Sequence, residues 1–130
     1  DQTARRTLEA ITHPAIRQRA EQRLARLKEA GVETAFYMAP LLFEAGTASR
    51  VQEVWVVYLD RETQLARLMA RDGLNREAAL LRVASQMPME EKKRLASIVI
   101  DNSGSRSELE AQVLRLWREE VLNRSSRQKA

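Results

Sequence analysis

The stretch VWVVYL at residues 54–59 decides the fold class of this 130-residue chain. It is β-branched and aromatic without alternating polar residues, which is the pattern of a strand covered on both faces. AFYMA at residues 35–39 and IVI at residues 98–100 are similar short apolar runs. We interpret residues 33–39, 54–59 and 98–100 as buried strands separated by helices. They predict an α/β fold of three layers, a parallel sheet with helices on both faces.

Helix start and stop signals lie between these runs. Asp60, Asn75 and Ser105 occupy N-cap positions, and Ser105 with Glu108 matches a capping box. We therefore expect helices over residues 61–71, after Asn75 and after Ser105, with another beginning at Pro88. These helices would cover the predicted sheet.

The N-terminal third is expected to hold two helices. Thr12-His13-Pro14 should break the first, because the residue before a proline avoids the α conformation. The second would then run to Ala30 and end at Gly31 in the left-handed conformation. At the other end of the chain, the polar tail at residues 123–130 is expected to be flexible.

Composition excludes several classes of protein. Lys plus Arg is 22 and Asp plus Glu is 18, which gives 22 − 18 = +4, with acids and bases interleaved. We therefore expect no nucleic-acid partner, and a basic nucleic-acid adaptor is the weaker alternative. The absence of cysteine excludes disulfides and cysteine-bound zinc and fits a cytoplasmic protein. No apolar run approaches about 18 residues, so we expect no membrane association.

Motifs for common catalytic centres are missing from these residues. The four glycines, at positions 31, 46, 73 and 104, can build neither a Gly-x-x-x-x-Gly-Lys-Ser/Thr loop nor a Gly-x-Gly-x-x-Gly loop. The single histidine, His13, cannot form a metal cluster, and a turn or core histidine is the favoured interpretation. By its residues alone the chain shows no recognisable catalytic centre.

Gln64, Arg67 and Arg71 form the first candidate site, at positions i, i+3 and i+7 of the helix predicted after residues 54–59. Two guanidinium groups one turn apart can grip phosphate oxygens in bidentate fashion. The alternative is a solvated helix face on which an arginine pairs with a nearby acid. Spacing alone favours the solvated face.

Two loops after predicted strands are the other candidates. PLLFEAG at residues 40–46 would be either a binding lip at a strand end or a cover for the core. DNSGS at residues 101–105 suits a tight turn with free N–H groups for a purine or phosphate, although an ordinary strand–helix turn is favoured. KKR at residues 92–94 reads as a solvated face.

Several motifs together resemble the dephospho-coenzyme A kinase family. MAPLLFEAG resembles that family's V-P-L-L-F-E-x-G segment, and VIDNSG is the same as its closing motif. The matches follow the family's order from about residue 12 to 117, and Ser97 is a departure from the usual Asp. The matching segments are residues 13–16 (H-P-x-I), 38–46, 64–73 (Q-x-x-R-L-x-x-R-D-G), 77–82, 85–92 (S-Q-M-P with E-K) and 99–104.

The resemblance implies a P-loop kinase fold that moves the γ-phosphate of ATP to the ribose 3′-hydroxyl of dephospho-CoA in coenzyme A biosynthesis. Its cofactors would be ATP and Mg²⁺, held mainly by a phosphate-binding loop and a catalytic Asp that precede residue 1. The chain would thus be a partial P-loop kinase domain, the C-terminal two-thirds, inactive by itself. The absent P-loop strand would lie between residues 33–39 and 54–59, so we expect these two strands not to pair directly.

The resemblance also implies a role for each candidate residue. Arg67 and Arg71 would be catalytic, neutralising phosphate charge, and residues 73–92 would form a lid that includes Gln86 and Lys92. A non-catalytic module that binds a nucleotide or a partner without turnover is the alternative, and the oligomeric state stays open. The remaining expected site residues are Asn102, Ser103 and Gly104 near adenine, and His13, Pro40, Leu41, Leu42, Phe43 and Glu44 around the acceptor.

Overall fold

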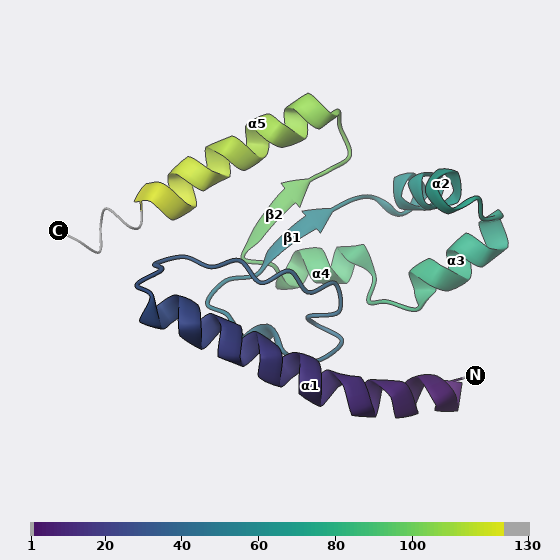
Figure 1. Cartoon of the computed structure of the whole chain (residues 1–130). Helices are drawn as coiled ribbons and strands as arrows, with labels where there is room; N and C mark the ends of the chain where they lie inside the picture. The colour runs from purple at the N-terminus through teal and green to yellow at the C-terminus, as the bar shows by residue number, and fades with distance from the viewer. Residues whose placement is uncertain (1, 124–130) are drawn as a thin grey trace. The chain divides into compact units, whose positions relative to one another are not determined.

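The computed structural model describes residues 2–123, and it divides into two compact units at Met38 and Ala39. The first unit holds one long helix, α1 (Gln2–Glu29). The second holds a parallel strand pair and the remaining helices (Figure 1). The α/β class with a parallel sheet is therefore confirmed.

Helix α1 runs without interruption through Pro14, so the predicted break at residues 12–14 is wrong. A proline inside a helix removes one hydrogen bond and costs about 3 kcal/mol. The alanine-, leucine- and arginine-rich sequence on both sides sustains the helix despite this cost. The predicted end is confirmed: Gly31 has φ 73°, and the N–H groups of Gly31 and Val32 donate to Lys28 and Leu27, both at 3.0 Å. This bonding is the Schellman motif.

Residues 33–39 form no strand, which corrects the prediction for this run. A strand satisfies its backbone N–H and C=O groups only through a neighbouring strand, and these residues have none in the described structure. Phe36 is 57% exposed and Met38 is 93% exposed, so the run also lacks the cover expected for a buried strand.

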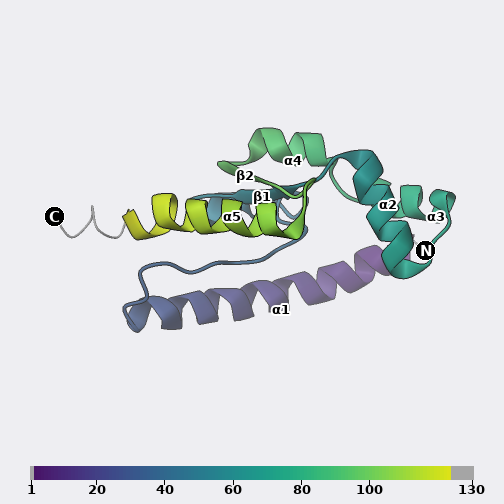
Figure 2. The same ribbon diagram turned by 90° about the horizontal axis from the view of Figure 1, so that it is seen from above.

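Strands β1 (Trp55–Tyr58) and β2 (Ile98–Asp101) pair in parallel, with Trp55 opposite Ile98 and Tyr58 opposite Asp101. Ser97, where the family usually has Asp, extends this pairing, because its hydroxyl accepts a hydrogen bond from the Val54 N–H at 3.1 Å. Helix α4 (Met89–Leu95) lies on one face of the pair and α5 (Arg106–Leu116) on the other (Figure 2). This is the predicted three-layer arrangement.

The predicted helix caps are confirmed. Asp60 caps α2 (Arg61–Asp72) by accepting from the Thr63 N–H at 3.0 Å, and Gly73 ends it with φ 65°. Asn75 caps α3 (Arg76–Ala84), and Ser105 with Glu108 forms the capping box of α5. A short 3₁₀ helix, η1 (Ala48–Arg50), precedes β1, and a π-helical stretch, η2 (Trp117–Leu122), continues α5. Of the predicted tail, residues 124–130 lie outside the described residues.

The core of the second unit is small. Its buried apolar side chains are Val56, Leu65, Ala79, Ile100, Leu116 and Val121. Val56 and Ile100 come from the two strands, so the sheet is covered by helices at the centre of each strand. The carboxyl ends of β1 and β2 are left at one edge, where ligands of parallel α/β proteins bind.

Candidate functional site

Arg67 joins two parts of the site that the sequence treats separately. It lies on α2, which follows β1, while the turn at residues 102–104 follows β2. The Arg67 guanidinium donates to the carbonyl of Asn102 at 2.9 Å and to that of Gly104 at 3.5 Å. Both strands end at the same edge. Arg67, which is expected to bind phosphate, therefore contacts the turn that is expected to lie near adenine.

The turn after β2 is held by its own hydrogen bonds. The Asn102 N–H donates to the Tyr58 carbonyl at 2.9 Å, the Ser103 N–H to Asp101 at 2.9 Å, and the Ser105 N–H to Glu108 at 2.7 Å. The less favoured interpretation, a turn with free N–H groups, is therefore wrong at residues 102, 103 and 105, where the favoured ordinary strand–helix turn is found. Hydrogen bonds from the Ser103 hydroxyl and N–H also lower the pKa of Asp101.

Gly104 lies close to the cap that follows it. A Cβ at Gly104 would lie 2.6 Å from Oε2 of Glu108, the oxygen that accepts from the Ser105 N–H. A side chain there would require the flexible end of Glu108 to shift. The side chain of Ser103 is exposed and that of Asn102 is half-buried, so both can contribute to a face available to a base.

Arg71 is an exposed residue near the end of α2, and its partner is the neighbouring carboxylate. It donates to Asp72 at 2.7 and 3.1 Å, and Arg82 of α3 donates to the same group at 2.6 Å. The hydrogen bond from Arg71 is the main cause of the lowered pKa of Asp72. This pairing with a nearby acid is what the solvated-face alternative anticipates. Gln64 lies half-buried on the same helix.

The loop at residues 40–46 is compact and attached to α4. Within it, the Ala45 N–H donates to the Leu41 carbonyl at 2.9 Å, and Leu42 and Phe43 are half-buried. Lys92 of α4 donates to Glu44 at 2.8 Å and to the Pro40 carbonyl at 3.1 Å. Lys92 is buried, so the interpretation of residues 92–94 as a solvated face is wrong for Lys92.

Glu44 has a second partner besides Lys92. It accepts a hydrogen bond from the Met87 N–H at 2.8 Å, directly after the expected lid residue Gln86, which is itself exposed. Burial alone would raise the pKa of Glu44, but the hydrogen bonds from Lys92 and Met87 outweigh it, and the pKa is lowered. Glu44 is thus held as a carboxylate.

Tyr58, at the end of β1, makes contacts near the candidate site that the sequence does not reveal. Its hydroxyl donates to Glu90 of α4, and the Lys93 ammonium lies 4.2 Å from the centre of its ring. The hydrogen bond to Glu90 raises the pKa of Tyr58 to about 12. Tyr58 and Glu90 are 32 positions apart, so only the packing of α4 on β1 brings them together.

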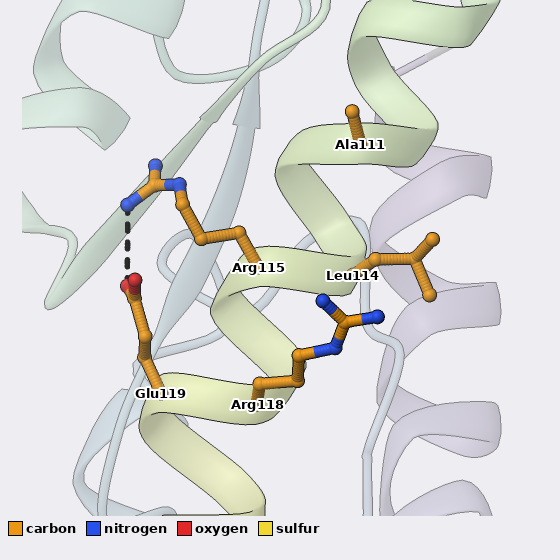
Figure 3. A pocket seen from close by; sticks show the side chains of 5 residues that line it. All are labelled: Ala111, Leu114, Arg115, Arg118 and Glu119. Atoms are coloured by element: carbon orange, nitrogen blue, oxygen red, sulfur yellow. Dashed lines mark hydrogen bonds and ion pairs between the residues drawn. The ribbon is translucent and has the colours of Figure 1, made fainter.

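His13 is exposed on α1, in the first unit, and its expected place beside the acceptor stays a prediction. Within residues 2–123, no group of three or more His, Asp or Glu side chains could hold a metal ion, and no helix is long and apolar enough to cross a membrane. A surface pocket of 520 Å³ lies on α5 and η2 (Figure 3). Its walls include the Arg115–Glu119 ion pair, 3.2 Å long, and neither residue belongs to the sites expected from the sequence.

Comparison with known proteins identifies relatives for most of the chain. The dephospho-CoA kinases of Geobacter sulfurreducens and Geobacter metallireducens are 60% and 56% identical over 117 and 118 residues, about nine-tenths of this chain. The chain spans 59% of the length of each.

Solved structures agree with this relationship. A crystal structure of a Thermus thermophilus protein superposes with a TM-score of 0.75 at 37% identity, covering 93% of this chain and 61% of that one. Dephospho-CoA kinase from Campylobacter jejuni superposes with a TM-score of 0.65 at 33% identity, covering 92% and 59%. The family model described as Dephospho-CoA kinase matches residues 1–108. The chain therefore belongs to the dephospho-CoA kinase family.

Proposed function

We propose that these residues form part of a dephospho-CoA kinase, which transfers the γ-phosphate of ATP to the ribose 3′-hydroxyl of dephospho-CoA in the cytoplasm. Family membership supports the reaction class. The observation that carries the proposal is the contact of Arg67 with the turn at residues 102–104, because it places a cation and a candidate adenine site at one edge of the parallel strand pair.

Arg67 and Arg71 are assigned to the transferred phosphate. An arginine has five N–H donors. Arg67 uses two on the turn carbonyls and Arg71 uses two on Asp72, which leaves three on each for phosphate oxygens. In a loose, in-line transition state such donors neutralise the charge on the phosphoryl oxygens. Both side chains are exposed, so an anion can reach them.

The other expected residues are assigned as the resemblance to the family implies. The loop at residues 40–44 and His13 would contact dephospho-CoA, and Asn102, Ser103 and Gly104 would contact adenine. Residues 73–92 would form the lid, with Gln86 and Lys92 in it. Mg²⁺, when bound with ATP, would supply charge neutralisation for the phosphates, and no described residue is assigned to hold it.

A direct assay tests the proposal. The complete protein should release ADP from ATP only when dephospho-CoA is present and should form coenzyme A. The 130 residues alone should show no turnover, because their sequence contains no P-loop lysine. Adenosine and ribose serve as control acceptors. Failure of the complete protein to phosphorylate dephospho-CoA would reject the kinase assignment.

Arg71→Ala in the complete protein tests the assigned role of α2. We expect kcat/KM to fall by about 10- to 100-fold through loss of one charge-assisted phosphate contact. Arg61→Ala is the matched control, since Arg61 is also exposed on α2 but lies at its other end. Unchanged kinetics in Arg71→Ala would show that Arg71 does not bind the phosphate and only pairs with Asp72 on a solvated helix face.

A non-catalytic nucleotide-binding module is the second candidate. It is favoured by the engaged N–H groups of the 102–105 turn and by the Arg71–Asp72 pair, which leave the candidate site partly satisfied without ligand. Binding of ATP by the complete protein without any turnover would support this module. Turnover would exclude it.

A further inference from the structure

Lys92 is the one buried charged residue among those described, with 7% of its surface exposed. A lysine loses hydration when it is buried, and it stays charged only if hydrogen bonds and an opposite charge replace that hydration. Lys93 and Arg94, the next two residues of α4, are exposed. The burial is therefore specific to the position of Lys92 and is not a general property of the basic end of α4.

The partners of Lys92 belong to one loop. Its ammonium contacts the first residue of the 40–46 loop through the Pro40 carbonyl at 3.1 Å and the fifth through the Glu44 carboxylate at 2.8 Å. Glu44 in turn accepts from the Met87 N–H at 2.8 Å, just before α4. Three contacts thus attach the loop to α4 and to the residue that leads into it.

Helix α4 is itself attached to the sheet. Glu90 accepts from the Tyr58 hydroxyl, and Lys93 lies over the Tyr58 ring at 4.2 Å. Tyr58 is the last residue of β1, so α4 has a fixed relation to the carboxyl end of that strand. The loop at residues 40–46 is then held at the strand end through α4.

We propose that Lys92 is a positioning residue that fixes the 40–46 loop on α4, and thereby sets the acceptor side of the site relative to the end of β1. This inference rests on the proposed function only for its kinetic consequence. The proposal also limits which part of the proposed lid can move. Helix α4 would stay on the sheet, and only the part of residues 73–92 before Met87 would be free to move.

Kinetics of the complete protein give the first test. Lys92→Met keeps the length and the apolar stem of the side chain but removes the charge and its hydrogen bonds. We expect the KM for dephospho-CoA to rise about tenfold, with the KM for ATP changed by less than about twofold. Arg106→Met is the matched control, because it breaks an exposed pair with Glu110. Equal effects on both substrates, or no effect, would overturn the proposal.

Hydrogen exchange gives a second test that does not depend on kinase activity. In Lys92→Met, the amides of Leu42, Ala45 and Gly46 should exchange about tenfold faster, while those of β1 keep their rates. If Lys92→Met instead loosens the whole protein, Glu44→Gln decides, because it removes the charge opposite the buried Lys92 while the Gln oxygen can still accept from the Met87 N–H. Faster exchange confined to the loop in Glu44→Gln supports the proposal, and unchanged loop exchange rejects it.

The two tests separate this inference from the proposed function. A protein without turnover whose loop exchange still responds to Lys92→Met would reject the kinase assignment and retain the positioning role. A protein with turnover whose loop exchange and substrate KM values do not respond to Lys92→Met would support the kinase assignment and reject the positioning role.

Discussion

Residues 35–39 and 54–59 look alike in sequence and differ in structure. Both are short apolar runs that contain aromatic residues, and both are predicted to form strands. Only the second forms one, as β1, and it does so where β2 supplies a parallel partner. The comparison teaches that an apolar run becomes a strand through its neighbours, since β propensity largely measures packing against cross-strand partners.

The exposure of side chains follows the same division. Val56 of β1 is buried, whereas Met38 of the other run is 93% exposed. Even within β1, Val57 is 53% exposed, because helices cover the strands only in part. Pairing therefore distinguishes the two runs, while burial also varies within the paired strand.

Hydrogen exchange should show the largest difference between the two runs. Amides of β1 and β2 that are bonded in the ladder should exchange at least about a thousandfold more slowly than those of residues 34–38, relative to random-coil rates. This corresponds to roughly 4 kcal/mol of opening free energy. Similar slow exchange in both runs would show that residues 34–38 have a partner in solution.

Ile100→Ala should weaken the paired region without touching the unpaired one. Ile100 is buried on β2, and truncating a buried isoleucine costs about 2–5 kcal/mol of unfolding free energy. Ile16→Ala is the matched control, since Ile16 is 57% exposed on α1 and should change stability by less than about 0.5 kcal/mol. Denaturant unfolding measures both, and equal costs would contradict the contrast.

Local signals in the sequence predict the parts of the fold that depend only on neighbours in the chain. Asp60, Asn75 and Ser105 cap helices as expected, because a cap is complete within about four residues. The predicted helix break at Pro14 and the predicted strand at residues 33–39 are wrong for the opposite reason. Their outcome depends on a long flanking helix in one case and on a strand partner in the other.

The candidate site shows the same limit. Arg67 and the turn at residues 102–104 are both recognisable in sequence, but their contact spans 35 positions. The pair between Glu44 and Lys92 spans 48, from 92 − 44, and without it a run of basic residues reads as a solvated face. Pairings of this kind arise only when the chain folds.

Ser105→Ala tests a locally predicted element at the exit from β2. Loss of an N-cap side chain costs about 1 kcal/mol, and here Glu108 also loses its partner hydroxyl. Ser49→Ala in η1 is the control, since Ser49 is exposed and lies outside any cap. Denaturant unfolding should separate the two variants, and equal stability would show that the capping box contributes nothing.

Acid should remove the contribution of Glu44. Its pKa is lowered in the fold, so the stability it contributes is fully present above its ordinary value of 4.5 and is lost as the pH falls through the folded value. Wild type should therefore exceed Glu44→Gln in melting temperature at neutral pH, with the gap closing below pH 4.5. A gap that stays constant with pH would show that the charge of Glu44 does not matter.

Tyr58 gives the smallest and most local comparison, because each of the two apolar runs contains one tyrosine. In a Tyr37→Phe background, tyrosinate absorbance should report Tyr58 alone, with a pKa of about 12 against an ordinary 10.0. The raised value means that the fold favours the neutral hydroxyl, so this contribution is present below pH 10.0 and is lost as the pH rises through about 12. Glu90→Gln removes the carboxylate whose hydrogen bond and charge raise the pKa of Tyr58, and should move that pKa back toward 10.0. Glu119→Gln, on η2, is the matched control and should leave the titration unchanged. If Tyr58 titrates at its ordinary value in the Tyr37→Phe protein, then α4 is not bonded to the end of β1 in solution.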